Sequence, residues 1–158
     1  MGLSEEDQKT LMVGGLFHDI GKIGVPDAIL RKPDRLTDEE YSEIKNHPLI
    51  GAHILAPATI FKDIVPIVKH HHEKYDGRGY PSQLAGENIP LFARIAAVAD
   101  TYDAMTSKRP YRDELPLEVV ISEIEKCKGT QFDPHIADVF LDILRNEYHE
   151  IQEIQEKY

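Results

Sequence analysis

The run of three histidines at 70–72, followed by Glu73 and Asp76, has the composition of a metal site. Imidazole nitrogens and carboxylate oxygens bind divalent transition metals. At successive positions on one helix, no single core face holds all three histidines, but two neighbours reach two metal ions lying side by side. Glu73 and Asp76 are near enough in sequence to accept hydrogen bonds from the imidazoles. The run therefore indicates metal binding.

A second candidate is the pair His18 and Asp19, with Lys22 about one helical turn later. Adjacent side chains on a helix diverge by about 100°, so the pair presents a nitrogen and an oxygen to the same metal or to neighbouring metals. His-Asp dipeptides are also common as helix caps and surface pairs. The pair alone leaves both interpretations open.

Two isolated residues complete the candidates. Asp100 lies in a run of Ile, Ala and Val that we expect to be buried. A buried carboxylate is costly unless it is paired or bound to a cation. Asp100 is therefore either part of a salt bridge with Lys22 or Arg94, or a metal ligand. His47 precedes Pro48 and is either a helix-junction residue or a ligand.

The segments that position these groups have helical patterns. Ser4 with Asp7, and Thr37 with Glu40, have the spacing of capping boxes. Several prolines suit a first helical turn, and Gly129 suits a C-terminal cap. The pattern predicts helices over 8–21, 38–46, 48–56, 63–75, 90–107, 116–128 and 134–144.

No stretch shows the sustained alternation of a β-strand, so we predict an all-α domain. Two loops, 21–36 and 76–89, combine Gly, Pro, Asp and basic residues, and such loops often display binding groups. Residues 145–158 continue an amphipathic pattern as a C-terminal helix extension. This extension is either a frayed helix end on a solvated surface, a contact with a second copy in a homodimer, or a connection to an adjacent domain.

Composition limits the function further. The 158 residues, 41% hydrophobic, fit a single domain over 1–158. The formal charge of −10 argues against binding to DNA or to anionic membranes. Metal cations would still allow a phosphate ligand to bind. The single Cys127, the acidic start and the lack of an apolar run of about 20 residues predict a cytoplasmic protein without membrane contact.

Taken in order, these segments resemble the HD superfamily of metal-dependent phosphohydrolases. The stretches "HDIGK", "HHEKYDGRGYP" and "ADTYDAMTSKRPYR" resemble its HD-GYP branch in particular, and the resemblance covers about 3–144. It implies an all-helical HD-domain bundle with two or three divalent metal ions, iron or manganese. It also implies hydrolysis of the bacterial messenger cyclic di-GMP to linear pGpG or to GMP.

The resemblance also assigns roles to individual residues. Lys22 would contact the scissile phosphate, acting with Asp19 in catalysis. Tyr80 would contact a base or shape the pocket, and Arg109 and Arg112 would hold the phosphates. The implied metal ligands are His18, Asp19, His47, His71, His72 and Asp100, with Glu73 and Asp76 supporting them.

The chain departs from the family at one point. HD-family sites normally take a first histidine from a helix upstream of the His-Asp pair, and no histidine precedes His18. We expect the domain to be incomplete at its N-terminus, lacking that first helix. Two alternative functions follow: an inactive module that senses cyclic di-GMP or docks on a diguanylate cyclase domain through the Gly-Tyr-Pro loop, and an HD phosphohydrolase acting on another nucleotide.

Overall fold

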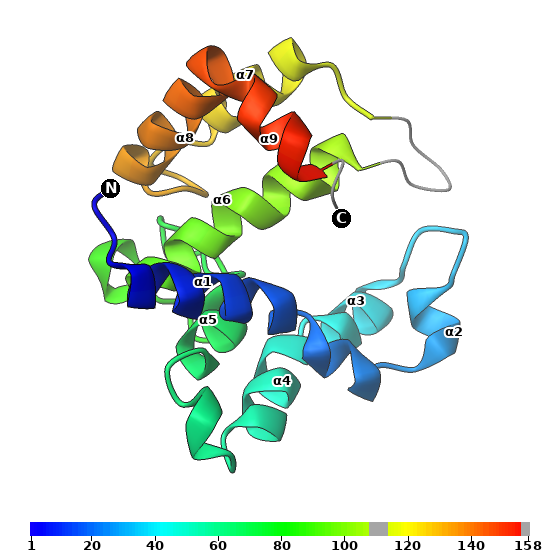
Figure 1. Ribbon diagram of the computed structural model, residues 1–158. Coiled ribbons are helices and arrows are strands. Elements are labelled where there is room, and N and C mark those ends of the chain that lie inside the picture. The colour runs from blue at the N-terminus through cyan, green and yellow to red at the C-terminus, as the bar shows by residue number, and fades with distance from the viewer. Residues whose placement is uncertain (108–113, 156–158) are drawn as a thin grey trace.

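The computed structural model describes residues 1–107 and 114–155, which form helices joined by short loops (Figure 1). The only β pairing among these residues is an isolated bridge between Lys128 and Phe132. The prediction of an all-α domain is confirmed. With η marking a 3₁₀ helix, the elements are α1 (Glu5–Phe17), η1 (Ile20–Gly24), α2 (Asp27–Leu30), α3 (Asp38–Ile44), α4 (His47–Leu55), η2 (Thr59–Phe61), α5 (Val65–His70), η3 (Gly86–Asn88), α6 (Leu91–Thr106), α7 (Leu117–Lys126), α8 (Pro134–Asn146) and α9 (Tyr148–Gln155).

Two helices begin at the capping boxes that the sequence predicts. Ser4 accepts a hydrogen bond from the backbone N–H of Asp7, whose side chain bonds back to Ser4. Thr37 and Glu40 make the same reciprocal pair at the start of α3. These bonds satisfy N–H groups that the first turn of a helix leaves without partners. Both capping predictions are confirmed.

Helix α6 lies between two groups of helices, with α1, α4 and α5 on one side and α7, α8 and α9 on the other (Figure 1). The larger hydrophobic cluster joins α6, α7 and α8 and includes Val98, Ile124 and Leu141. The smaller one includes Leu55 and Val68 and joins α4 and α5 to the end of α1. Helix α6 also packs against α1 and α5. Its residue Asp100 therefore lies next to His18, which directly follows α1.

Two helices end four or more residues earlier than predicted, and candidate ligands lie at both ends. The helix predicted over 8–21 ends at Phe17, and Asp19 departs from helical geometry with φ −98° and ψ 6°. The helix predicted over 63–75 ends at His70, so His71 caps it and His72 lies in the next turn. The backbone N–H of Glu73 donates to the His70 carbonyl at 3.0 Å, which reverses the chain. The placement of all three histidines on one helix was wrong.

The early end of α1 has a packing cause. A Cβ atom added at Gly21 would lie 1.9 Å from the His47 carbonyl oxygen and 2.5 Å from the Gly51 nitrogen. Only glycine allows η1 to approach the start of α4 this closely. The same approach accompanies the contact of Asp19 with His47, whose Nε2 lies 3.2 Å from Asp19 Oδ1.

The C-terminal extension is a separate helix rather than a continuation of α8. Glu147 has φ −129° and ψ 23°, which interrupts the helix, and α9 begins at Tyr148. Tyr148 and Ile151 pack against the larger hydrophobic cluster. In the part of 145–158 that the structure describes, the extension therefore folds back onto its own domain.

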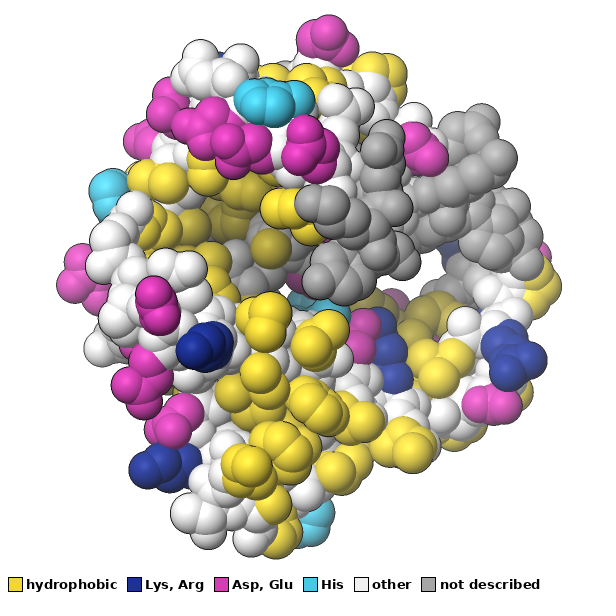
Figure 2. Space-filling model, in the orientation of Figure 1, with side chains coloured by type: hydrophobic (Ala, Val, Ile, Leu, Met, Phe, Trp, Pro, Cys, Tyr) yellow, Lys and Arg dark blue, Asp and Glu magenta, His cyan; other side chains and the backbone are white. Residues whose placement is uncertain are grey.

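Hydrophobic side chains gather on the face that carries α1 and α4 (Figure 2). Leu16 on α1 is 76% exposed and Ile60 on η2 is 83% exposed. A hollow of about 260 Å³ runs between α1 and α6 and has His18 and Asp100 in its lining.

Within 1–107 and 114–155, no helix combines the length and apolar character that crossing a membrane requires.

Candidate metal centre

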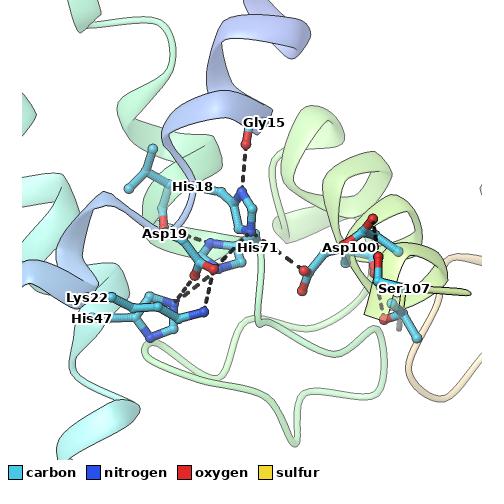
Figure 3. A network of polar contacts seen from close by, with 12 residues as sticks. Gly15, His18, Asp19, Lys22, His47, His71, Asp100 and Ser107 are labelled. Atoms are coloured by element: carbon cyan, nitrogen blue, oxygen red, sulfur yellow. Dashed lines mark hydrogen bonds and ion pairs between the residues drawn. The ribbon is translucent and has the colours of Figure 1, made fainter. Parts of the chain in front are cut away.

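Four side chains from distant parts of the chain meet at one point. Asp19, His47, His71 and His72 each offer one ligand atom, and these atoms all lie within 4.8 Å of one another. Asp19 precedes η1, His47 begins α4, and the two adjacent histidines follow α5. Figure 3 shows Asp19, His47 and His71 pointing toward one another. The structure thus brings together four of the six ligands that the resemblance implies.

The remaining two, His18 and Asp100, form a second group beside the first. His18 Nε2 lies 3.6 Å from Asp100 Oδ1 and 3.4 Å from Asp19 Oδ2. Neither salt bridge considered for Asp100 is present, because Lys22 pairs with Asp19 and Arg94 pairs with Asp133 at 2.5 Å. All six predicted ligands are therefore adjacent.

Asp19 connects the two groups. Its Oδ1 atom lies 3.2 Å from His47 Nε2, while its Oδ2 atom faces His18. The two oxygens of one carboxylate thus point to two separate sets of nitrogen donors.

Main-chain carbonyls orient three of the imidazoles. The Nδ1 atoms of His18, His47 and His71 lie 2.6, 2.7 and 2.9 Å from the carbonyl oxygens of Gly15, Ile44 and Val68. A carbonyl only accepts, so each Nδ1 carries the hydrogen. In the neutral imidazole, Nε2 then presents its lone pair toward the centre. This is the usual way in which proteins orient metal-binding histidines.

The donor set fits a cation. His47 Nε2 and His71 Nε2 lie 3.3 Å apart, and two lone pairs at this distance repel unless a positive charge lies between them. Asp19 Oδ1 is buried and has no hydrogen-bond donor among the described residues. A buried carboxylate oxygen of this kind is costly unless a cation compensates it. The combination of imidazole and carboxylate is that of a divalent metal site.

Burial prepares two of the histidines for metal binding. It lowers the pKa of His71 to about 3, helped by the neighbouring imidazoles. It also lowers the pKa of His72 to about 4, where His47 contributes in the same direction. Both side chains are therefore neutral at pH 7, and metal binding requires the neutral form.

Charge is distributed differently around His18. Burial acts to lower the pKa of His18, but its hydrogen bonds with Asp100 and Asp19 outweigh burial and raise it to about 10. Burial opposes ionisation of Asp19, yet its contacts with His18, His47 and Lys22 hold the pKa of this carboxyl far below its usual range. Asp19 and Asp100 thus share His18 as a hydrogen-bond partner.

Lys22 lies at the edge of the centre. Its Nζ atom donates to Asp19 Oδ2, and its side chain is 42% exposed. The ammonium group can therefore reach both the centre and a ligand that arrives from solvent. Figure 3 shows Lys22 next to Asp19 and His47.

Tyr80 is held against the ligand His72. The two ring centroids are 4.9 Å apart, with 31° between the ring planes. The backbone N–H of Tyr80 donates to the His72 carbonyl at 3.2 Å. A Cβ atom added at Gly79 would lie 2.2 Å from the Lys74 nitrogen, so the loop packs directly on the backbone after α5. This part of the loop 76–89 therefore forms one wall of the site.

Glu73 fixes that loop rather than the metal ligands. Glu73 is only 3% exposed, and its carboxylate accepts hydrogen bonds from the backbone N–H groups of Ser82 at 2.7 Å and Leu84 at 3.1 Å. Its Oε1 also lies 3.4 Å from His70 Nδ1. The prediction that the Glu73 carboxylate orients His71 and His72 was wrong, because this carboxylate contacts His70, Ser82 and Leu84.

Asp76 differs from the prediction in the same way. Its carboxylate accepts from the Arg78 backbone N–H at 3.0 Å and from the Arg78 guanidinium at 2.5 Å. This pair stabilises the turn after Asp76, while the Val68 carbonyl orients His71.

Arg109 and Arg112 lie outside the described residues. Sequence reasoning missed Gly21, for which the available signal was its position between Asp19 and Lys22.

Comparison with known proteins gives matches over most of the chain. Residues 1–136 match the sequence profile of the HD domain family. The chain is 41% identical over 143 residues to the cyclic di-GMP phosphodiesterase response regulator RpfG of Xanthomonas campestris pv. campestris, covering 89% of this chain and 38% of that protein. It is 43% identical over 143 residues to a cyclic di-GMP phosphodiesterase of Thermotoga maritima, covering 89% and 39%. The chain thus spans about two fifths of the length of these relatives.

A solved structure has the same fold. The crystal structure of a cyclic GMP-AMP-specific phosphodiesterase of Vibrio cholerae superposes with a TM-score of 0.69 over 92% of this chain and 40% of that chain. The two sequences are 20% identical in this comparison, so the likeness concerns the helical arrangement.

Proposed function

The chain belongs to the HD domain family, and from this premise we propose that it hydrolyses a phosphodiester bond of cyclic di-GMP at a centre of two divalent metal ions. The observation that carries the proposal is the position of Asp19. Its two carboxylate oxygens face His47 and His18, which belong to two adjacent groups of donors.

The ligands divide between the two ions. His47, His71 and His72 would hold one ion, His18 and Asp100 the other, and Asp19 would contact both. Imidazole favours iron and carboxylate favours manganese, so this mixed set suits either metal. Two ions bound here would supply an activated water and neutralise charge that develops on the phosphate.

The residues of the chain contribute binding and orientation. Lys22 has its ammonium at the edge of the centre, where it would donate to a non-bridging phosphate oxygen and stabilise its negative charge. Asp19 holds Lys22 in this place through their ion pair. Arg109 and Arg112 would hold the remaining phosphate, a role that rests on their sequence motif. Arginine suits it because its fork of donors matches phosphate oxygens.

The relatives support the choice of substrate. Both curated relatives described above are named as cyclic di-GMP phosphodiesterases, and each matches 89% of this chain. Net charge does not oppose an anionic substrate here, because bound metal ions dominate the field in such a site. The Tyr80 wall beside His72 adds an aromatic surface at the place where a nucleotide would enter.

The test is hydrolysis of cyclic di-GMP by the metal-loaded chain, with linear pGpG and GMP separated by chromatography. We expect turnover by the unchanged protein and its loss in His71→Ala. His135→Ala is the control, because His135 is exposed at the start of α8. Absence of turnover by the loaded protein, or equal turnover in His71→Ala, would refute the proposal. Cleavage of cyclic GMP-AMP alone would refute the choice of substrate.

A further inference from the structure

A cavity of about 300 Å³ opens beside the candidate metal centre. His72 and Asp100 belong to its lining, so it is continuous with the metal ligands. Its lining also includes Tyr80, Thr101 and Gln131, from the loop after α5, from α6 and from the turn after α7. Tyr41 and Lys74 line it as well. This volume is at the lower end of the range for small-molecule sites, about 300–1,000 Å³.

Beside the carboxylate of Asp100, one face of helix α6 presents small side chains to the cavity. Ala97, Thr101 and Ala104 are spaced by four and three residues and share one face of the helix. Because none of these side chains is long, the space beside α6 stays open. A flat ring system can lie against this face.

Gln131 is held with its amide in one orientation. The Thr101 hydroxyl donates its single hydrogen to the Ala97 carbonyl at 2.8 Å. Its contact with Gln131 at 3.2 Å must therefore have the Gln131 Nε2 as donor. The Gln131 Oε1 atom remains as an acceptor with no hydrogen-bond partner within the described ranges.

The turn that carries Gln131 is attached to the loop that carries Tyr80. The backbone N–H of Tyr75 donates to the Gln131 carbonyl at 3.1 Å, and that of Asp76 donates to the Thr130 carbonyl at 2.9 Å. Tyr80 in turn packs on His72. An acceptor and an aromatic ring are thus fixed next to the metal ligands before any substrate arrives.

We propose that this cavity binds a guanine base of the substrate, with Gln131 Oε1 accepting a hydrogen bond from the base and the Tyr80 ring forming an aromatic wall. Guanine fits an acceptor because its ring N–H and its exocyclic amine are neighbouring donors. The inference rests on the proposed function, since a phosphate at the metal centre places its own nucleoside in the adjoining space. It adds a specificity-determining residue to that function.

The test compares a nucleotide with the same molecule lacking its base. GMP and ribose 5-phosphate are titrated into the Mn²⁺-loaded chain by calorimetry, using the unchanged protein, Gln131→Met and Gln152→Met. Methionine is similar to glutamine in length but offers no comparable acceptor. Gln152 is exposed on α9 and serves as the matched control.

We expect GMP to bind the unchanged protein more tightly than ribose 5-phosphate. Gln131→Met should weaken GMP binding by roughly 3- to 10-fold, the size of one neutral hydrogen bond, and leave ribose 5-phosphate and the metal content unchanged. Gln152→Met should alter neither ligand.

The inference would be overturned by equal binding of the two ligands by the unchanged protein, by equal weakening of both by Gln131→Met, or by loss of metal in that variant. An unaffected GMP affinity in Gln131→Met would do the same. Failure of the loaded protein to cleave cyclic di-GMP, with the GMP selectivity intact, would refute the proposed function and leave the base site standing.

Discussion

His47 and His71 face each other through their Nε2 atoms at 3.3 Å, while the Nδ1 atom of each donates to a main-chain carbonyl. With the hydrogen of each ring on Nδ1, the two Nε2 atoms direct their lone pairs at one point. Two lone pairs that converge in this way repel each other, and a cation bound by both nitrogens replaces this repulsion with attraction. The fold holds these residues in place by burial, since each is 1% exposed.

The first prediction concerns metal and stability. A metal ion that binds only the folded chain adds about 2.7 kcal/mol at 100-fold excess over Kd, or roughly 5–10 °C in Tm for a domain of this size. We expect Mn²⁺ to raise Tm by this amount and a chelator to reverse it. His71→Ala should lose most of the increase, whereas His53→Ala, exposed on α4, should keep it. An equal increase in both variants would contradict this site.

The second prediction separates the two metal positions. Asp100→Ala should lose one metal ion and lower the turnover by several orders of magnitude, because Asp100 contacts His18 but is not part of the four-residue cluster. Asp19→Ala should lose both ions. Metal content by mass spectrometry provides the measurement. Asp142→Ala, exposed on α8, is the control, and unchanged metal and turnover in Asp100→Ala would remove Asp100 from the site.

The third prediction compares Gly21 in η1 with Gly15 near the end of α1. Gly21→Ala should cost about 1–3 kcal/mol, because the new Cβ meets the His47 carbonyl, which lies on rigid backbone. Gly15→Ala meets nothing within 4 Å and should stabilise α1 by about 0.5–1 kcal/mol. Denaturant unfolding measures both changes. Metal affinity should fall only in Gly21→Ala, and a stable Gly21→Ala protein would refute the close approach of η1 and α4.

The fourth prediction tests Glu73 as the residue that positions the loop. Glu73→Gln replaces one of two acceptor oxygens by a donor that faces a backbone N–H, and should cost about 1.5–3 kcal/mol. Displacement of Tyr80 should raise KM for cyclic di-GMP with metal content unchanged. Glu87→Gln, exposed in the same loop, should alter stability by less than about 0.5 kcal/mol. Loss of metal in Glu73→Gln would instead support the contact with the ligands that the sequence predicts.

Local signals in the sequence predicted the helical class and the two capping boxes, because caps depend on residues three positions apart. The helix ends at Phe17 and His70 were not predictable in this way. The first end is accompanied by the approach of Gly21 to the distant His47. The second is followed by the attachment of Tyr75 to the distant Gln131 carbonyl. Periodicity in a single sequence contains no information about such contacts.

The candidate site shows the same division. Residue type and motif singled out all six candidate ligands, and the structure places them together. The contacts of Glu73 were predicted incorrectly, since proximity in sequence suggested His71 and His72 whereas the chain reversal turns its carboxylate to Ser82 and Leu84. Gln131 was not singled out at all, because its importance depends on Thr101, thirty residues earlier.

Orientation of the imidazoles by Gly15, Ile44 and Val68 involves carbonyl groups, which every amino acid possesses. A substitution at any of these three positions leaves the direction of the corresponding ring intact, provided that the backbone keeps its path. The direction of these three imidazoles therefore does not depend on the side chains at positions 15, 44 and 68. Substitutions among the non-ligating residues that line the adjoining cavity can therefore change nucleotide selectivity without moving the metal ligands.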